Sequence, residues 1–344
     1  MPGTFRFSFG PWNIHEGADP FGPTVRPTLP FAEKLKLYKK LGFDGVQFHD
    51  DDAVPDLNNM SAAEVNKAAK QIAQILQGEG LVAEFVAPRL WEDPRTIDGG
   101  YTSNNDTERQ YAIDRSLQAI DIANALGTKN IVLWLAREGT YIREAKDATR
   151  AVNQLVNAIN QMLAHDPDIK ILVEPKPNEP MDLAYIPTIG HAIGLSYLTD
   201  DPSRVGALVE SAHAVLAGLD PSDEMAYAMA HKKLWSVHLN DQNGLKFDQD
   251  KAFGAVDLRR AFMQVWVLDR NGYGNNGEFV GLDVKAMRTQ KAEQATQHLS
   301  NSHEIFLALL DVVRGLDQSR IDSLITRRDY DTLEWEIVRA LLGR

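Results

Sequence analysis

Short apolar runs, each followed by a charged or imidazole side chain, recur along the whole chain. Residues 169–173, interrupted only by Lys170, lead into Glu174, and residues 205–209 lead into Glu210. Similar runs end at His49, His238 and Asp283. A continuous apolar run of this length is typical of a strand that is covered on both faces. The pattern therefore predicts buried strands that deliver polar side chains at their ends.

Stretches with helical spacing of apolar residues separate these runs. The clearest is 106–126, which ends at Gly127, and 62–77 has Ser61 as its predicted cap. The predicted strands are 5–9, 45–48, 82–86, 130–134, 169–174, 205–209, 234–239 and 278–283. The predicted helices are 34–41, 62–77, 106–126, 145–164, 185–198, 211–216 with 223–230, 256–268 and 304–316.

Eight alternating strands and helices predict an α/β fold of the (β/α)₈ TIM barrel type. A doubly wound sheet is the alternative, but it would need a glycine-rich phosphate turn after the first strand. The sequence Gly10-Pro11-Trp12-Asn13 is not such a turn. In a barrel the active site lies at the C-terminal ends of the strands, where the polar side chains fall here. We therefore expect a catalytic barrel domain over residues 1–318.

The segment 319–344 continues past the predicted barrel. Its apolar residues have heptad-like spacing and are Ile321, Leu324, Ile325, Leu333, Ile337 and Leu341. This spacing predicts a short C-terminal helical extension that packs on the barrel or on a neighbouring subunit.

Composition narrows the choice of function. The chain of 344 residues has no cysteine, so disulfides and thiolate metal sites are excluded, and a metal must bind through carboxylates and imidazoles. The N-terminal sequence does not resemble a signal peptide, and no run is long enough for a membrane helix, so we expect a cytoplasmic protein without a membrane partner. The formal net charge of -12 argues against a nucleic-acid partner.

Candidate metal ligands gather in the second half of the predicted barrel. Glu174, Glu210 and Asp283 end three strands, and His213 follows Glu210 by three residues. Asp248 and Asp250 lie two residues apart in the loop after the seventh strand. Oxygen and nitrogen ligands that converge from separate elements are what a divalent cation needs. Taken singly, the loop aspartates would more often be solvated and His213 an ordinary helix residue. Together they predict two adjacent metal sites that share a bridging carboxylate.

Several segments resemble the sugar isomerases of the xylose isomerase family, particularly its shorter actinobacterial-type class. The segments are Trp12, Asp19-Pro20-Phe21-Gly22, Phe48-His49-Asp50-Asp51-Asp52, Trp134, Arg137-Glu138-Gly139, Glu174-Pro175-Lys176-Pro177-Asn178-Glu179-Pro180, Leu239-Asn240 and Gln242-Asn243-Gly244-Leu245-Lys246-Phe247-Asp248-Gln249-Asp250. The resemblance covers roughly residues 5 to 290.

This resemblance implies two divalent metal ions per subunit. Glu174, Glu210 and Asp283 would hold the first ion. Glu210, His213, Asp248 and Asp250 would hold the second.

The resemblance also implies roles for other side chains. Lys176 would donate a hydrogen bond to the aldehyde oxygen, and His49, oriented by Asp52, would assist ring opening. Trp12, Trp91 and Trp134 would wall the pocket, although core packing would be the better interpretation of these tryptophans without the resemblance. Phe21 would reach the pocket of a neighbouring subunit, which implies a homodimer or homotetramer.

The chain departs from the family pattern near the seventh strand. His238 stands where the family has an aspartate ligand, and Asp241 is the other candidate for the missing ligand. An imidazole there would favour manganese or cobalt over magnesium. The family's long C-terminal arm is also much reduced.

The resemblance therefore implies a metal-dependent aldose–ketose isomerase. Its substrate would be an unphosphorylated sugar such as D-xylose, and the reaction a ring opening followed by a 1,2-hydride shift. One alternative is an isomerase for another aldose, such as L-rhamnose. Another is a metal-dependent hydrolase or endonuclease on the same barrel, which the acidic net charge and Lys176 beside Glu174 oppose.

Overall fold

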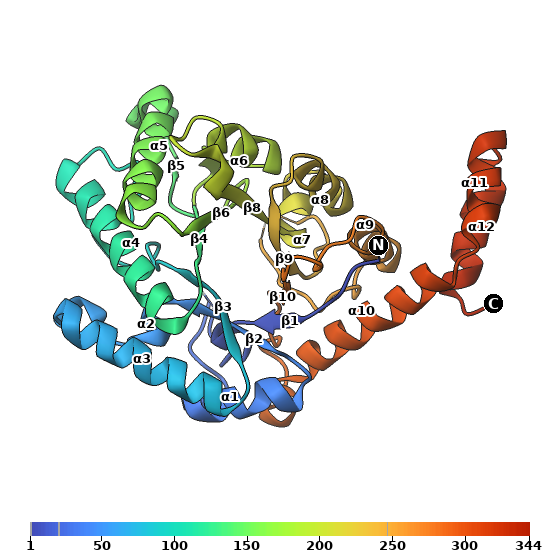
Figure 1. The fold of residues 1–344 in the computed structure, drawn as a ribbon, viewed down its shortest axis with the longest axis horizontal. Coiled ribbons are helices and arrows are strands. Elements are labelled where there is room, and N and C mark those ends of the chain that lie inside the picture. The colour runs from blue at the N-terminus through green and yellow to red at the C-terminus, as the bar shows by residue number, and fades with distance from the viewer. Residues whose placement is uncertain (1, 20, 246) are drawn as a thin grey trace.

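The chain folds into a closed barrel of parallel strands surrounded by helices (Figure 1). The computed structural model describes residues 2–19, 21–245 and 247–344. Pro20 and Lys246, which belong to two of the segments that carry the resemblance, lie outside the described residues. The eight barrel strands are β1 (Phe7–Phe9), β2 (Gly45–His49), β3 (Val82–Ala87), β4 (Asn130–Trp134), β6 (Lys170–Glu174), β8 (Val205–Glu210), β9 (Leu234–Leu239) and β10 (Val280–Leu282). The predicted (β/α)₈ fold is confirmed.

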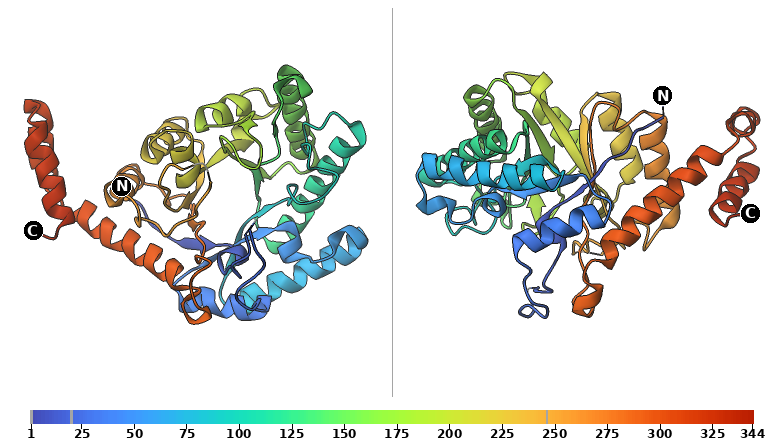
Figure 2. Two further views of the ribbon diagram at one scale, coloured as in Figure 1. Left: turned by 180° about the vertical axis from the view of Figure 1, so that it is seen from behind. Right: turned by 60° about the horizontal axis from the view of Figure 1, so that its bottom comes forward.

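Helices lie between successive strands and cover the outside of the barrel (Figure 2). They are α1 (Phe31–Lys40), α2 (Asp50–Ala53), α3 (Ala62–Gly78), α4 (Asp106–Leu126), α5 (Ala148–His165), α6 (Ile189–Ser196), α7 (Ser211–Leu216), α8 (Pro221–Ala230), α9 (Leu258–Arg270) and α10 (Gln297–Gly315). The strands β5 (Gly139–Thr140) and β7 (Leu183–Ala184) form a small separate sheet beyond the barrel strands.

Local sequence accounts for the elements that were predicted most accurately. Ser61 accepts a hydrogen bond from the backbone N–H of Glu64, whose carboxylate accepts from the Ser61 N–H in return, so α3 begins with a capping box. Helix α4 ends at Gly127, which has a φ of 86° and takes the left-handed conformation that glycine allows without strain.

Four predicted helix starts were wrong by three or more residues. Helix α1 begins at Phe31, three residues before the predicted start. Helix α5 begins at Ala148 because Asp147 caps it, and α6 begins only after Pro187. Helix α10 begins at Gln297, seven residues before the predicted start. Its first turns bury His298 and Ser302, and these polar side chains hid the helical pattern. Both are hydrogen-bonded, since His298 contacts the Asn13 carbonyl and Ser302 donates to the His298 carbonyl.

The register of the strands brings the predicted site residues to one level of the barrel. Glu174 on β6 pairs with Trp134 on β4, and Glu210 on β8 pairs with His238 on β9. On the other side, His238 pairs with Gly281 of β10. A Cβ at Gly281 would lie 3.0 Å from His238 Cδ2, so a larger residue there would crowd the imidazole. The strand ends thus deliver their side chains into one shared space.

The barrel interior holds apolar side chains together with a buried polar group, in which Ser8, Gln47 and Ser236 donate hydrogen bonds to Glu84. Phe85, Ala87, Val132, Leu172 and Leu208 form a buried cluster, with Trp12 and Trp235 packed against it. A larger core lies between the strands and the surrounding helices. The interior is therefore a packed layer that supports the polar level above it.

The C-terminal helices form an arm that projects from the barrel (Figures 1 and 2). Helix α10 packs on α9 and leads to α11 (Gln318–Arg327) and α12 (Tyr330–Leu341). An ion pair of 2.6 Å between Arg259 of α9 and Glu334 of α12 also joins the arm to the barrel. The helical extension is confirmed, while its division from the barrel at residue 318 stays a prediction. Among the described helices, none has the length and apolar character needed to cross a membrane.

Candidate metal centre

A cavity of about 370 Å³ opens at the C-terminal ends of the barrel strands. All the candidate metal ligands line it, as do the predicted catalytic residues His49 and Lys176 and the three predicted wall tryptophans. The structure thus brings most of the predicted site residues together. The exceptions are Asp52, which contacts His49 but does not line the cavity, and Phe21, which lies elsewhere on the surface.

Glu210 lies at the centre of the candidate metal ligands. One of its oxygens lies 3.5 Å from His238 Nδ1, and the other lies 3.2 Å from His213 Nε2. Glu210 has ligand atoms within 4.8 Å of three separate pairs of side chains, which are Glu174 with His213, His238 with Asp283, and Asp248 with Asp250. This geometry matches the predicted bridging carboxylate.

The first group of ligand atoms surrounds one imidazole nitrogen. His238 Nδ1 lies 3.4 Å from Glu174 Oε1 and 3.8 Å from Asp283 Oδ2, in addition to its approach to Glu210. Both nitrogens of His238 are buried and make no hydrogen bond to a described residue. A buried polar atom without a partner is costly, so it points to a missing ligand.

The second group consists of Glu210, His213, Asp248 and Asp250. His213 Nε2 lies 3.1 Å from Asp248 Oδ2, while His213 Nδ1 and Asp248 Oδ1 are buried without a hydrogen bond among the described residues. Here, however, lysines hold the carboxylates. Lys176 Nζ lies 2.9 Å from Asp248 Oδ2, and Lys285 Nζ lies 2.7 Å from Asp250 Oδ2. Both groups offer the carboxylate and imidazole donors that suit a divalent cation.

The crowded carboxylates differ in the direction in which their pKa values are shifted. Burial alone would raise the pKa of Glu174, but the charges of His238 and His213 lower it to about 2. Burial raises the pKa of Glu210 well above its ordinary value, and the negative charges of Asp248 and Asp283 add to that rise. Burial and the Asp248 charge likewise raise the pKa of Asp250. Protons therefore stabilise this cluster in the way a cation would, and cation binding must compete with them.

Neighbouring amides and an indole fix two of the ligands. The Nε1–H of Trp12 and the Nδ2–H of Asn13 both donate to Asp283 Oδ1, at 2.9 and 3.0 Å. Asn240 Nδ2 donates to Glu210 Oε1 at 2.9 Å. These bonds leave Asp283 Oδ2 and Glu210 Oε2 directed at the first group, as supporting hydrogen bonds around a metal site do.

His238 and Asp241, the two candidates for completing the first group, occupy different surroundings. Asp241 is buried, but its carboxylate accepts the backbone N–H groups of Gln242, Val256 and Asp257. It does not line the cavity. Asp241 thus anchors the loop that leads into α9, and His238 is the side chain that faces the carboxylates.

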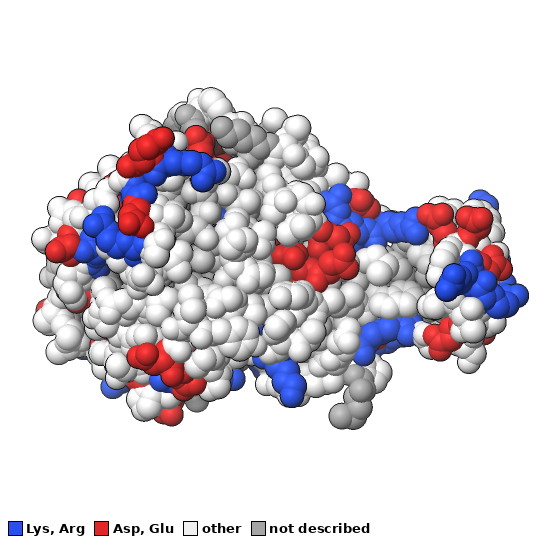
Figure 3. Space-filling view, turned by 90° about the horizontal axis from the view of Figure 1, so that it is seen from above, with Lys and Arg blue, Asp and Glu red and all other residues white. Residues whose placement is uncertain are grey.

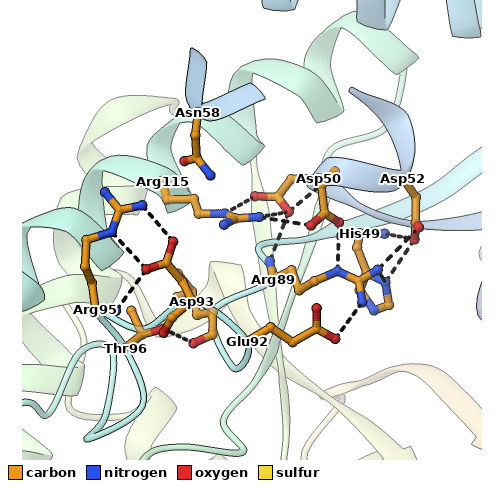
Figure 4. A network of polar contacts seen from close by, with 12 residues as sticks. His49, Asp50, Asp52, Asn58, Arg89, Glu92, Asp93, Arg95, Thr96 and Arg115 are labelled. Atoms are coloured by element: carbon orange, nitrogen blue, oxygen red, sulfur yellow. Dashed lines mark hydrogen bonds and ion pairs between the residues drawn. The ribbon is translucent and has the colours of Figure 1, made fainter. Parts of the chain in front are cut away.

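A network of ion pairs lies beside the cavity (Figure 4). His49 Nδ1 lies 2.9 Å from Asp52 Oδ2, as expected for a residue oriented by Asp52. Arg89, which follows β3, contacts the same nitrogen at 2.6 Å and pairs with Asp51 at 2.8 Å. His49, Asp51 and Asp52 have the spacing of a further metal site, but the guanidinium of Arg89 already supplies the positive charge among them.

Aromatic rings form one wall of the cavity. The rings of Trp91 and Trp134 meet edge to face with centroids 4.6 Å apart, and the Trp12 ring lies 4.1 Å from that of His49. Lys176 Nζ lies 5.0 Å from the centre of the Trp134 ring, a favourable cation–π distance. Phe21 is 88% exposed, so the described residues leave its side chain largely uncovered.

Sequence reasoning missed Arg89, Lys285, Asn13 and Asn240. A signal existed for three of them. Arg89 lies three residues after a predicted strand, Asn240 directly follows one, and Lys285 lies two residues after Asp283, as Lys176 does after Glu174. Asn13 carried no distinguishing pattern.

Solved structures with the same fold come from proteins of several kinds. The IOLI protein with a bound zinc atom has a TM-score of 0.62 at 14% identity, covering 91% of this chain and 100% of that chain. An L-ribulose 3-epimerase has a TM-score of 0.65 at 13% identity, covering 94% and 98%. A family 2 AP endonuclease from Brucella melitensis has a TM-score of 0.57 at 19% identity, covering 86% and 97%. At these identities the likeness establishes the fold alone.

The family described as "Xylose isomerase-like TIM barrel" matches residues 35–295. This match takes in β2 to β10 and every candidate metal ligand. The chain belongs to the xylose isomerase-like TIM barrel family.

Proposed function

We propose that the protein is a metal-dependent aldose–ketose isomerase that interconverts an unphosphorylated aldose, such as D-xylose, with its ketose. The observation that carries the proposal is the position of Glu210 between two groups of ligand atoms. A shared carboxylate would place two divalent cations next to each other. Two such cations would polarise neighbouring oxygens of one substrate, which suits a sugar with oxygen on adjacent carbons.

Lys176 supports this assignment through its position. Its ammonium is buried, pairs with Asp248, and lies on the cavity wall beside Trp134. Burial would lower the pKa of Lys176, but the charges of Asp248 and Glu179 raise it above its ordinary value, so the ammonium stays protonated. It can therefore donate a hydrogen bond to a substrate oxygen on which negative charge develops.

The surroundings of the reacting carbons favour transfer of hydrogen between them without exchange with water. The tryptophan wall limits the access of water to one side of the cavity. No carboxylate of the first ligand group would be free to take a proton from the substrate, because all of them would hold metal. These are Glu174, Glu210 and Asp283. We infer that the hydrogen on carbon 2 moves with its electron pair to carbon 1. The carbon 2 hydroxyl loses its proton and its oxygen becomes the ketose carbonyl, while the carbon 1 oxygen gains a proton and becomes a hydroxyl.

The ligand set also bears on the choice of metal. We propose that the first group holds manganese or cobalt in preference to magnesium. It combines three carboxylates with the His238 imidazole, and magnesium prefers oxygen ligands.

A hydrolase or endonuclease is the rival from another class. Such an enzyme would present a basic surface to nucleic acid. The described residues on the face seen in Figure 3 carry Lys and Arg in small groups among Asp and Glu, without a continuous basic stretch. The net charge of -12 likewise argues against a nucleic-acid partner.

We further propose that two or more subunits assemble through the C-terminal arm. Exposed apolar side chains of the arm include Ile325, Tyr330, Trp335 and Leu342. An arm that projects from its own barrel leaves these side chains free to pack on a second copy. In such an assembly, the exposed Phe21 would be available to the partner's cavity.

The test is a panel of aldoses and ketoses assayed with Mn²⁺, Co²⁺ and Mg²⁺, with the aldose deuterated at carbon 2. Formation of a ketose with the label on carbon 1 is the expected result. An epimer of the starting sugar, or extensive loss of label to water, would point to proton transfer instead. Cleavage of an abasic-site duplex without sugar conversion would favour the endonuclease.

A further inference from the structure

The Nδ1 nitrogen of His49 has two partners that make opposite demands on it. Asp52 Oδ2 lies 2.9 Å away and can only accept a hydrogen bond, while the Nη2 of Arg89 lies 2.6 Å away and can only donate one (Figure 4). A ring nitrogen carries either one hydrogen or one lone pair in the plane of the ring. Only one of the two contacts can therefore be a hydrogen bond.

Asp52 has hydrogen-bond donors other than the imidazole. Its Oδ2 accepts the backbone N–H of His49 at 3.1 Å, and its Oδ1 accepts from Arg89 Nη2 at 3.3 Å. If Nδ1 carries a lone pair, its shorter contact, with Arg89, is a hydrogen bond. Asp52 then still accepts from the backbone N–H of His49 and from Arg89. With a hydrogen on Nδ1, two N–H groups would face each other at 2.6 Å.

Arg89 cannot move away easily. Its Nε donates to Asp51 at 2.8 Å and its Nη1 lies 3.3 Å from Glu92. The guanidinium carries no acceptor, so its contact with Nδ1 can only be a hydrogen bond that it donates. The Nδ1–H form of His49 is therefore disfavoured.

We propose that Arg89 is a positioning residue that holds His49 as the Nε2–H tautomer. His49 lines the cavity, and its Nε2 makes no hydrogen bond to any described residue. The nitrogen left for a ligand is thus a donor. Asp52 then acts on His49 by holding Arg89 and the backbone, rather than by accepting from Nδ1.

This assignment adds a specificity element, which rests on the proposed function. His49 would donate a hydrogen bond from Nε2 to an acceptor oxygen of the sugar, such as the ring or carbonyl oxygen. The tautomer itself does not depend on which reaction the protein performs.

Nitrogen-15 NMR of the histidine side chains tests the tautomer directly. Two-bond correlations in the Mg²⁺-loaded protein distinguish a protonated from an unprotonated ring nitrogen, and the signal lost in His49→Gln assigns the residue. We expect Nε2 protonated and Nδ1 unprotonated. A hydrogen on Nδ1 in the wild-type protein overturns the proposal.

Variants then identify the residue responsible. In Arg89→Met the hydrogen should move to Nδ1, where Asp52 can accept it, while in Asp52→Asn it should stay on Nε2. Arg95→Met is the matched control, because Arg95 pairs with Asp93 in the same network without touching His49. An unchanged spectrum in folded Arg89→Met would refute the role of Arg89. If that variant does not fold, the wild-type and Asp52→Asn spectra still decide.

These spectra need no substrate. A protein with Nε2–H that converts no sugar would disprove the proposed function and leave the tautomer assignment intact.

Discussion

Lys176 Nζ lies 2.9 Å from Asp248 Oδ2, so an ammonium already neutralises one of the candidate ligands of the second metal. Lys285 does the same for Asp250, whereas the described residues place no lysine against Glu174 or Asp283. The two groups of ligands are therefore unequal. The group around His238 should bind a divalent cation first, and the group around Asp248 only at higher concentration.

We predict that Lys176→Met tightens binding of the second metal while it impairs turnover. Removing a positive charge beside Asp248 should raise the second affinity roughly tenfold, about 1.4 kcal/mol. Loss of the donor to the substrate oxygen should lower kcat roughly 100-fold. Calorimetric titration with Mn²⁺ and steady-state kinetics measure the two effects. Lys129→Met, which removes a lysine on the outside of the barrel, should change neither. A second affinity that falls in Lys176→Met would contradict this account.

The exchange of His238 for aspartate should change the metal preference. His238→Asp replaces the only imidazole of the first group by a carboxylate, so activity with Mg²⁺ should rise relative to Mn²⁺ and Co²⁺. Activity of the variant with each metal, compared with the wild-type ranking, measures the shift.

Asp241→Ala is the matched comparison. It removes a carboxylate that accepts three backbone N–H groups, so it should lower the free energy of unfolding by about 1–3 kcal/mol without altering the metal ranking. If Asp241→Ala abolished metal binding while His238→Asp left the ranking unchanged, the assignment of His238 would be wrong.

The buried His298 should make the fold sensitive to mild acid. Burial lowers the pKa of His298 to about 4 from 6.5, so the unfolded chain takes up a proton at a higher pH than the folded protein. The stability that this residue contributes is present above pH 6.5 and is lost as the pH falls toward 4, by about 3 kcal/mol at the limit. In His298→Gln, an amide can still donate to the Asn13 carbonyl but does not titrate. Denaturant unfolding at several pH values should show that the free energy of unfolding falls less steeply with acid in this variant than in the wild type. The same pH dependence in both proteins would refute the prediction.

The arm should govern association. Trp335 on α12 is 54% exposed, and a tryptophan at the centre of an interface contributes about 2 kcal/mol or more. Trp335→Glu should therefore weaken assembly roughly 30-fold in sedimentation experiments. Ile75→Glu, which changes an exposed apolar residue on α3, is the control and should leave the mass unchanged. A wild-type monomer at high concentration would remove the basis of the proposed assembly.

Most of the fold could be predicted from the sequence because local sequence patterns mark its strands and helices. Apolar runs marked every barrel strand within two residues, and Gly127 marked the end of α4. Prediction failed where polar side chains are buried, as at His298 and Ser302 in α10, since their partners come from distant segments. Only the folded chain brings Asn13 next to α10.

The candidate site could also be predicted only in part. Strand ends placed Glu174, Glu210, His238 and Asp283 together, because parallel strands share one edge. The choice between His238 and Asp241 could not be made from the sequence, since it depends on how the loop before α9 uses the Asp241 carboxylate. The competition between Arg89 and Asp52 for one nitrogen likewise required the positions of two loops.

The central claim is that two cations sharing Glu210 make this barrel an isomerase. The most direct measurement titrates Mn²⁺ into thoroughly demetallated protein while following bound metal and conversion of the preferred aldose together. Conversion should be absent without metal and should develop with the second equivalent rather than the first. Full turnover in the demetallated protein, or full turnover with a single bound ion, would contradict the account.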